Sequence, residues 1–173
     1  EGHCTTARDL ARITAYALRN RTFREIVSAR EWRTECEGTE TLRVFHNKNK
    51  MLYSYEGADG VKTGFTKEAG RCLVSAAERE GMQLVCVVLN SPAMYERSAE
   101  LLDGCFAGYT RTCLFDAETY TARVAAGHRG KVCSCSCRES FYYPLAEGEA
   151  EHIRTEESLV PRLSLPVQKG EEA

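Results

Sequence analysis

The residues best suited to chemistry lie in one short segment, Asp59-Gly60-Val61-Lys62-Thr63-Gly64-Phe65-Thr66. The ammonium of Lys62 supplies a fixed positive charge, and the hydroxyl of Thr63 can hydrogen-bond a substrate carboxylate. Gly64 has no Cβ, so a substrate backbone can approach the strand closely. Peptide N–H groups on such a strand can also help to form an oxyanion site. For the tripeptide alone, a strand end with a turn glycine is the more frequent explanation, so the surrounding sequence has to decide.

A second candidate is the alternating segment Cys133-Ser134-Cys135-Ser136-Cys137. On a strand, residues two apart share a face, so three thiolates could line one side. A tetrahedral zinc site needs a fourth ligand, and its usual spacing is C-x-x-C. We therefore expect a half-buried strand face and no metal. The chain has nine cysteines, and because several lie within apolar runs, we expect most of them to be reduced core residues.

Three aromatic residues, Trp32, Tyr53 and Tyr55, leave two interpretations open. They could form a platform for a carbohydrate ring. Packing in the core or at its rim is favoured, because no periodic aromatic stripe links the three positions.

The elements that position the Lys62 segment follow from the periodicity of the sequence around it. Four apolar or alternating runs predict strands, the first of them half-buried: 38–46, 60–64, 71–77 and 82–89. The turn Glu78-Arg79-Glu80-Gly81 joins the last two runs into a hairpin, and a polar loop, 47–50, follows the first.

Three further stretches predict helices, each with its own start signal: 6–19, 22–29 and 91–107. Thr6 can cap the first helix, with Asp9 three residues on. Thr22-Phe23-Arg24-Glu25 is a second capping box. Ser91 can cap the third helix, with Pro92 at its first position.

Composition limits the range of functions. The chain has 173 residues and a formal net charge of −2 at pH 7, which does not favour a nucleic-acid partner. The longest apolar run, Leu84–Leu89, is too short to cross a bilayer. After about residue 110, short runs broken by glycines and prolines predict a small all-β module over 111–173. We therefore expect an α+β chain with a boundary near residue 110.

Six segments, in chain order, closely resemble the low-molecular-mass penicillin-binding proteins that act as serine-type D-alanyl-D-alanine carboxypeptidases (peptidase family S11): His3–Ala11, Phe23–Ser28, Asn47–Leu52, Gly57–Thr66, Glu68–Val74 and Val87–Pro92. The resemblance covers residues 2 to about 110, and residues 111–172 resemble the family's β-rich C-terminal domain more loosely. The implied fold is part of a penicillin-binding-protein/β-lactamase-like catalytic domain over 1–110, an antiparallel sheet with helices. A small, incomplete all-β sandwich follows over 111–173.

The resemblance also implies a chemistry. Such enzymes trim peptidoglycan by removing the terminal D-alanine of stem pentapeptides through an acyl-enzyme. They need no metal or cofactor, and β-lactams acylate the same serine. By position, Lys62, Thr63 and Gly64 take the K-T-G role, and Phe65 and Thr66 continue the strand edge that faces the substrate. Lys48 lies in a loop where the family often places a basic side chain near the site.

The family works outside the cytoplasmic membrane, where a C-terminal amphipathic helix anchors it to the cell envelope. The resemblance therefore implies an extracytoplasmic protein. It implies contact with the membrane only through an anchor, which is absent from this chain, as is a signal peptide.

The sequence departs from the family in one respect. The catalytic serine and lysine come from an S-x-x-K motif and a second serine from S-x-N, and none of the serines in this chain fits either motif. Both motifs precede the matching segment in the family. We therefore expect a C-terminal fragment that holds only the third motif and does not turn over substrate by itself. Two alternatives stay open: a non-catalytic cell-wall or protein-interaction module derived from the family, and a β-lactamase of related fold, which the β-rich tail disfavours.

Overall fold

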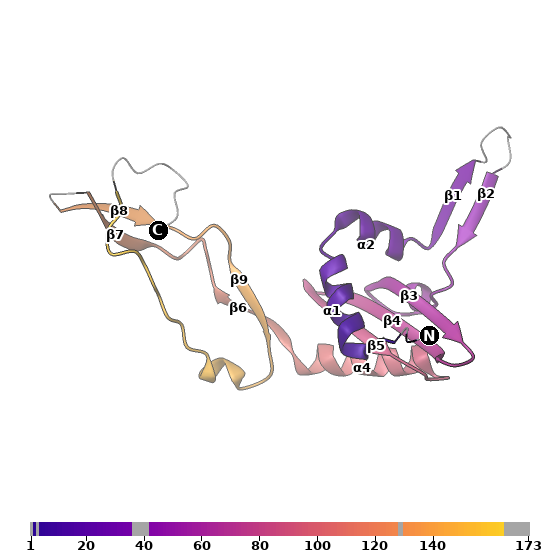
Figure 1. Ribbon diagram of the computed structural model, residues 1–173. Helices are drawn as coiled ribbons and strands as arrows, with labels where there is room; N and C mark the ends of the chain where they lie inside the picture. Colours follow the sequence, from indigo (N-terminus) through magenta and orange to yellow (C-terminus); the bar gives the residue numbers. More distant parts are fainter. Residues whose placement is uncertain (1, 3, 36–41, 128–129, 165–173) are drawn as a thin grey trace. The chain divides into compact units, whose positions relative to one another are not determined.

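A three-stranded antiparallel sheet, in the order β3-β4-β5, forms the centre of the first of two units (Figure 1). The computed structural model describes residues 2, 4–35, 42–127 and 130–164. The chain divides into the units Glu1–Gly108 and Tyr109–Ala173. The three central strands are β3 (Ala58–Thr66), β4 (Gly70–Arg79) and β5 (Met82–Val88).

The β4–β5 hairpin confirms the sequence prediction for this region. Arg79 pairs with Met82, so the turn between the strands has two residues, Glu80 and Gly81. Both have positive φ, 51° and 74°. A two-residue turn of this conformation matches the twist of the flanking strands, and glycine favours it. The predicted strand at 60–64 is also present, but it is longer, because its pairing with β4 runs from Ala58 to Thr66.

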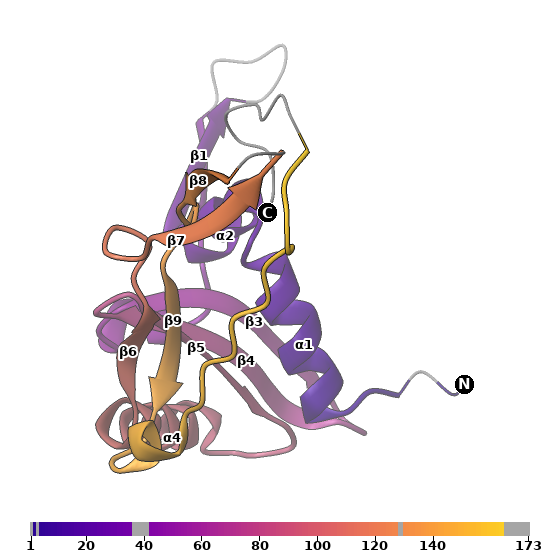
Figure 2. The same cartoon turned by 90° about the vertical axis from the view of Figure 1, so that its left-hand side faces the viewer.

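Helices cover both faces of this sheet (Figures 1 and 2). On one face, α1 (Ala7–Ala17) packs on β4 and β5, and α2 (Arg21–Ser28) packs on β3. On the other face, α4 (Met94–Gly108) packs on β4 and β5, and the short α3 (Met51–Ser54) contacts β3.

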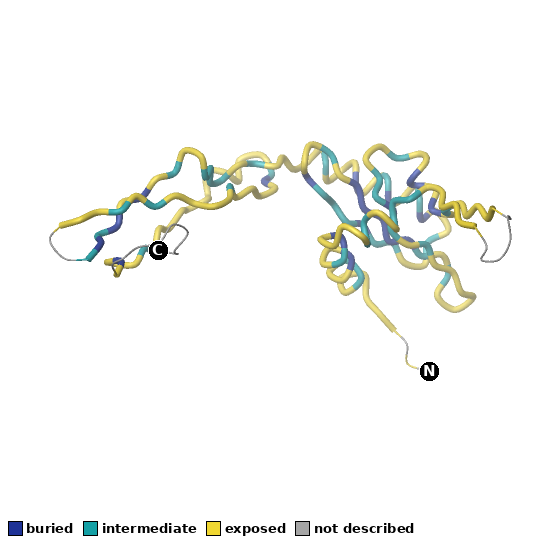
Figure 3. The backbone as a smooth tube through the Cα atoms, turned by 90° about the horizontal axis from the view of Figure 1, so that it is seen from above, coloured by how far each residue is buried: buried dark blue, intermediate teal, exposed yellow. Residues whose placement is uncertain are grey.

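The alternation of side chains along β4 separates these two layers. Leu73 and Ala77 point to the layer of α4, whereas Val74 points to α1 and α2. The main core lies between the sheet, α3 and α4, and the buried stretches of the first unit follow the central strands (Figure 3). Its buried members are Met51, Leu73, Ala77, Cys86, Met94 and Leu102.

The helix starts agree with the sequence in part. Oγ1 of Thr6 accepts a hydrogen bond from the backbone N of Asp9 at 3.1 Å, so the first predicted cap is confirmed. The cap predicted at Thr22 is wrong. Oδ1 of Asn20 accepts from the backbone N of Phe23 at 3.0 Å, so the cap lies two residues earlier than predicted and α2 begins at Arg21; asparagine is among the best N-cap residues. The third helix, α4, begins at Met94, after a turn that contains Pro92.

A two-stranded hairpin leads from α2 toward α3 (Figure 1). β1 (Glu31–Glu35) pairs with β2 (Leu42–His46). The strand predicted over 38–46 is confirmed from residue 42, and residues 38–41 lie outside the described residues. The predicted half-burial is wrong, because all residues of both strands are exposed. The hairpin pairs with no other described strand. The sequence does not predict β1, since one apolar residue, Trp32, gives no alternation.

The second unit contains two small antiparallel sheets. β6 (Thr110–Phe115) pairs with β9 (Phe141–Leu145), and β7 (Ala122–Ala126) pairs with β8 (Lys131–Cys135). A 3₁₀ turn, η1 (Glu149–His152), follows β9. The buried residues of this unit gather around Val124, Ala126 and Leu163. The α+β class is therefore confirmed. Among the described helices, none has both the length and the apolar composition that a membrane span requires.

The cysteines differ from the prediction that most lie in the core. The eight described cysteines are free thiols, but only Cys86 is buried. Cys133 and Cys135 are half-buried on one face of β8 and pack against the core of the second unit, as expected for a strand face. Cys137 lies beyond the strand and is exposed. Within the described parts of the chain, no three potential metal ligands come together.

Candidate functional site

The Lys62-Thr63-Gly64 segment lies on β3, at the edge of the central sheet. Among the described strands, β3 pairs with β4 only. One row of its backbone N–H and C=O groups is therefore not used by the sheet. An extended peptide can add to such an edge through main-chain hydrogen bonds. The position of the segment thus suits recognition of a peptide.

The register with β4 shows which face each side chain occupies. Lys62 is opposite Val74 and Gly64 is opposite Cys72, so both belong to the face of α1 and α2. Thr63 is opposite Leu73 and belongs to the other face. Lys62 is exposed, and its ammonium donates a hydrogen bond to the carbonyl oxygen of Thr63.

Two glycines of β3 have different surroundings. Gly60 has φ 105°, and a Cβ on it would lie 2.4 Å from the carbonyl oxygen of Val27 in α2. The close packing of α2 on β3 therefore requires glycine at this position. At Gly64, an added Cβ would meet only the Cβ of Cys72, at 3.9 Å, which is ordinary contact. Packing within the described chain therefore does not require glycine at position 64.

A cavity of about 420 Å³ lies between this part of β3, β4 and the helices α1 and α2. Lys62, Thr63 and Gly64 line one side of it. The remaining lining is mostly apolar: Leu10, Thr14, Phe23, Val27, Val61, Cys72, Leu73, Val74 and Leu89. Apolar walls with a few polar groups at one side are typical of small-ligand sites.

Phe65 and Thr66, which continue the strand, do not line this cavity. Both are exposed. The guanidinium of Arg71 lies 5.8 Å from the ring centroid of Phe65. Oγ1 of Thr66 accepts from the backbone N of Ala69 at 2.9 Å and thereby closes the turn to β4. The structure thus gives Thr66 a local contact of its own at the end of the strand.

Lys48 lies in the loop between β2 and α3, and its side chain is exposed. Its carbonyl oxygen accepts a hydrogen bond from the hydroxyl of Tyr95 in α4 at 3.3 Å. The side chain of Asn47 donates to the carbonyl oxygen of Ala29, just after α2, at 3.1 Å. The loop is therefore tied to elements that cover opposite faces of the sheet. Lys48 does not line the cavity that Lys62 lines.

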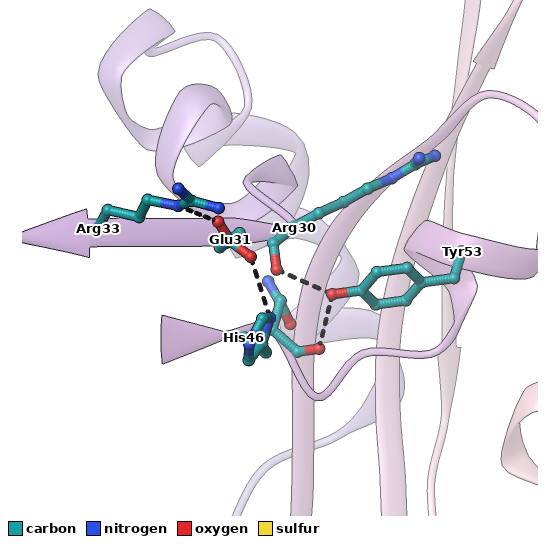
Figure 4. A network of polar contacts seen from close by, with 6 residues as sticks. Arg30, Glu31, Arg33, His46 and Tyr53 are labelled. Carbon is teal, nitrogen blue, oxygen red and sulfur yellow. Dashed lines mark hydrogen bonds and ion pairs between the residues drawn. The ribbon is translucent and has the colours of Figure 1, made fainter. Parts of the chain in front are cut away.

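A polar network fixes the base of the β1–β2 hairpin beside this loop (Figure 4). The hydroxyl of Tyr53 lies 2.8 Å from the carbonyl oxygen of Arg30. The carboxylate of Glu31 accepts from Nε of Arg33 at 2.5 Å and lies 3.4 Å from Nδ1 of His46. The hydrogen bond from Arg33 holds the pKa of Glu31 below its ordinary value of 4.5.

The three aromatic residues considered as a carbohydrate platform make separate contacts. Trp32 is 66% exposed on β1, opposite Phe45, so the expectation that it packs in the core or at its rim is wrong. Tyr53 supports the hairpin base. Tyr55 packs at the rim of the core, and the guanidinium of Arg79 lies 4.6 Å from the centroid of its ring.

Sequence reasoning did not find the residues that hold the loop, Asn47, Asn49 and Tyr95. The N-x-N spacing is a usable signal, because asparagine side chains often bond the backbone two residues on. Oδ1 of Asn47 accepts from the N of Asn49 at 2.9 Å, and Oδ1 of Asn49 accepts from the N of Met51 at 3.1 Å.

Comparisons with known proteins show which family this chain resembles. A sequence model of a family described as D-alanyl-D-alanine carboxypeptidase matches residues 1–93. The D-alanyl-D-alanine carboxypeptidase DacF of Bacillus subtilis is 28% identical over 177 residues, which cover 99% of this chain and 45% of that protein. The D-alanyl-D-alanine carboxypeptidase of Streptomyces sp. strain K15 is 37% identical over 100 residues, which cover 56% of this chain and 34% of that protein.

The crystal structure of the Streptomyces K15 DD-transpeptidase is similar in fold. It matches with a TM-score of 0.55 at 37% identity, and the match covers 60% of this chain and 42% of that chain. The present chain therefore spans less than half the length of the curated relatives named above.

Proposed function

The chain belongs to the D-alanyl-D-alanine carboxypeptidase family, and from this premise we propose that the protein containing it removes the terminal D-alanine of peptidoglycan stem pentapeptides. One observation carries the proposal. Lys62, Thr63 and Gly64 lie on the free edge of β3, where they line a cavity with apolar walls. That edge can take an extended peptide, and the lysine can receive its anionic end.

The proposed roles follow from the chemistry of each group. Lys62 provides positive charge beside the reacting centre, and Thr63 hydrogen-bonds the terminal carboxylate of the peptide. Gly64 lets the peptide backbone come close to the strand. Phe65 and Thr66 extend the same edge, and Lys48 adds a second cation near the start of β3.

The nucleophile in this proposal is a serine of an S-x-x-K motif, in the part of the family that these 173 residues do not span. Its oxygen attacks the carbonyl carbon of the penultimate D-alanine, and the peptide bond to the terminal D-alanine breaks. The terminal D-alanine leaves with its nitrogen protonated. Water then hydrolyses the ester and frees the serine. The residues of this chain bind and orient the peptide and require no cofactor.

Residues 1–110 would then form the C-terminal portion of the catalytic domain, and 111–173 a β-rich domain that follows it. By itself the chain is proposed to be inactive, because it lacks the nucleophile. β-Lactams would acylate the same serine in the intact protein, which would act outside the cytoplasmic membrane at the cell envelope.

Labelling with a fluorescent penicillin and release of D-alanine from a stem pentapeptide test this proposal, in the complete gene product that contains residues 1–173. We expect Lys62→Ala to abolish most labelling, because the substituted protein loses the charge beside the nucleophile. Lys67→Ala is the matched control: it removes an exposed lysine from the turn after β3 and should label normally. Unchanged labelling of Lys62→Ala contradicts the assigned role.

The alternative function is that of a non-catalytic cell-wall or protein-interaction module derived from the family. The coding sequence upstream of Glu1 distinguishes the two. An open reading frame that continues through S-x-N and S-x-x-K supports the enzyme. A start codon close to Glu1, with neither motif, supports the module.

A further inference from the structure

Cys72 of β4 places a thiol in the wall of the cavity that Lys62, Thr63 and Gly64 line. In the register of β3 and β4 it lies opposite Gly64. Gly64 has no side chain, and a Cβ added to it would meet only the Cβ of Cys72, at 3.9 Å. No side chain at this position of β3 therefore covers the thiol. A group attached to Cys72 would lie over the K-T-G strand, on the side of the cavity.

Two backbone groups hold the sulfur of Cys72 at this place. Sγ accepts a hydrogen bond from the backbone N of Asn90 at 3.5 Å, and the S–H donates to the carbonyl oxygen of Ala69 at 3.6 Å. The residue is half-buried, and among the described cysteines it is the one that lines this cavity. Reactive cysteines are partly exposed and lie in electropositive surroundings. The charges around this thiol therefore decide which small molecules it can meet.

The helical wall of the same cavity contains a buried polar group with no use inside the chain. Thr14 of α1 lines the cavity and is 6% exposed. Its hydroxyl forms no hydrogen bond with the residues that the structure describes. Buried hydroxyls normally have a hydrogen-bond partner. Independently of Cys72, an unpartnered hydroxyl in this wall indicates that a polar group of a ligand enters the cavity.

Lys62 sets the charge that such a ligand should carry. It belongs to the same face of the sheet as Cys72, and diagonal neighbours on two antiparallel strands lie about 7–8 Å apart, within reach of a long side chain. Among the described residues that line the cavity, Lys62 is the one that carries a charge. It forms no ion pair with any residue that the structure describes. A carboxylate next to Cys72 is therefore favoured over an ammonium.

We propose that Cys72 is a site of reversible thiol modification, which takes small disulfides bearing a carboxylate and thereby closes the cavity beside Lys62. The Cys72 thiolate attacks one sulfur of the disulfide, so that a new S–S bond forms and the S–S bond of the small molecule breaks. The other half leaves as a thiolate, and the proton of the Cys72 thiol passes to solvent. Cys72 is oxidised, the leaving half is reduced, and an added thiol reverses the step.

Three disulfides of equal chain length test this proposal in the complete gene product that contains residues 1–173: dithiodipropionate, hydroxyethyl disulfide and cystamine. Each attaches a two-carbon group, which ends in a carboxylate, a hydroxyl or an ammonium. Trypsin cleaves after Arg71 and Arg79, so Cys72 is the one cysteine of its peptide, and mass spectrometry follows its modification alone. The measured quantity is the equilibrium constant for mixed-disulfide formation, divided by that of the same reagent with N-acetylcysteinamide.

We expect the constant at Cys72 to decrease in the order carboxylate, hydroxyl, ammonium. The first should exceed the last by about fivefold or more at low salt, and by less at high salt, because salt screens the charge of Lys62. Lys62→Met should remove this preference. Lys67→Met, which removes an exposed lysine from the turn after β3, is the control and should retain it.

Thr14→Val removes the unpartnered hydroxyl and keeps the shape of the side chain. It should lower the constant for the carboxylate reagent by about threefold, the effect of losing one hydrogen bond. The proposal is overturned if Cys72 is not modified, if the three reagents give equal constants, if Lys62→Met retains the preference, or if Thr14→Val has no effect.

That the modification excludes the peptide rests on the proposed function, and labelling with a fluorescent penicillin tests it. Modification by dithiodipropionate should abolish most labelling, and dithiothreitol should restore it. Cys72→Ala keeps every other cysteine, so its labelling should be the same with and without the reagent. Labelling that the reagent leaves intact in the unsubstituted protein, or abolishes in Cys72→Ala, contradicts the exclusion of the peptide by Cys72. A gene product that neither labels nor releases D-alanine refutes the proposed function, whereas the equilibrium constants at Cys72 still decide the present inference.

Discussion

At the scale of single residues, the two glycines of β3 differ in how much space surrounds them. Gly60 combines φ 105° with a position where a Cβ would lie 2.4 Å from the Val27 carbonyl oxygen. Gly64 has no such neighbour, since Cys72 is 3.9 Å from its added Cβ. Packing thus explains the glycine at position 60, whereas the glycine at position 64 is explained by the proposed approach of a peptide backbone.

This difference gives a prediction. Gly60→Ala should lower the free energy of unfolding by about 1–3 kcal/mol from backbone strain alone, with a further loss from the clash. Gly64→Ala should unfold within about 0.5 kcal/mol of the unsubstituted protein but lose most penicillin labelling in the complete gene product. Chemical denaturation and labelling measure the two effects. Equal destabilisation by both alanines would show that the distinction is wrong.

Tyr55 carries a second prediction at this scale. Its hydroxyl donates to Oδ1 of Asp103 at 2.6 Å, and desolvation together with that hydrogen bond raises the pKa of Tyr55 well above its ordinary value of 10. The folded state therefore holds the phenolic proton more tightly than the unfolded state. The resulting stabilisation is complete below pH 10 and is lost as the pH rises above it.

Tyr55→Phe removes the hydroxyl and keeps the ring beside Arg79. We expect it to lower stability at pH 7 by about 1 kcal/mol, the usual net value of one hydrogen bond. We also expect the fall in stability between pH 9 and pH 11 to become shallower. Tyr53→Phe, which removes a hydroxyl from the hairpin base, is the control, and an equal flattening of its alkaline profile would contradict the assignment to Tyr55.

At the scale of elements, the β1–β2 hairpin is stabilised mainly by the pairing of its two strands and by the polar network at its base. Arg33 holds the pKa of Glu31 below 4.5 by a hydrogen bond, with a smaller contribution from His46. Because the folded pKa is lowered, this stabilisation is present above pH 4.5 and is lost as the pH falls through the folded value.

We therefore expect the hairpin to open in acid before the central sheet unfolds. Amide exchange of Trp32, Thr34 and Phe45, which belong to the hydrogen-bonded pairs of the hairpin, should accelerate below pH 4.5 relative to that of β4, after correction for the intrinsic rates. Glu31→Gln should exchange faster than the unsubstituted protein at pH 6 and show a smaller change on acidification. If strands β2 and β4 open together at every pH, the hairpin is not an independent element.

The elements differ in how far the sequence predicts them. The β4–β5 hairpin is predicted because burial produces an apolar pattern in the sequence, to which Leu73 and Ala77 belong. The start of α1 is predicted because Thr6 is a residue type that caps helices. β1 has no such pattern, since both of its faces are exposed. Asn20 takes the cap that Thr22 was expected to form, because both residue types can cap and only the chain path decides between them.

The residues of the candidate site also differ in how far the sequence predicts them. Lys62, Thr63 and Gly64 are recognisable because the motif is contiguous and a strand is predicted around it. The role of Asn47 is not recognisable from the motif, because its partners include the backbone carbonyl oxygens of Val27 and Ala29. Every residue has such a carbonyl, so the sequence contains no specific sign of the contact.

At the scale of the whole molecule, the apolar surface of the first unit carries a prediction. Ile13 and Tyr16 of α1 and Ile26 of α2 are 62%, 77% and 67% exposed. Exposed apolar side chains of this size promote association. We expect the isolated 173-residue chain to bind a hydrophobic dye and to self-associate at micromolar concentration in light scattering. Ile13→Glu with Ile26→Glu should reduce both effects, and a monomeric chain with one cooperative thermal transition contradicts the expectation.

The contrast between the two glycines of β3 has a consequence in the cell. Steady-state abundance follows the folded fraction, because proteases remove unfolded chains. Substitutions at Gly60 should therefore be seen as low protein levels. Substitutions at Gly64 should leave a normally abundant protein that no longer captures its ligand, so a survey of variants by protein level alone would record Gly64 as tolerant and overlook the position closest to the proposed function.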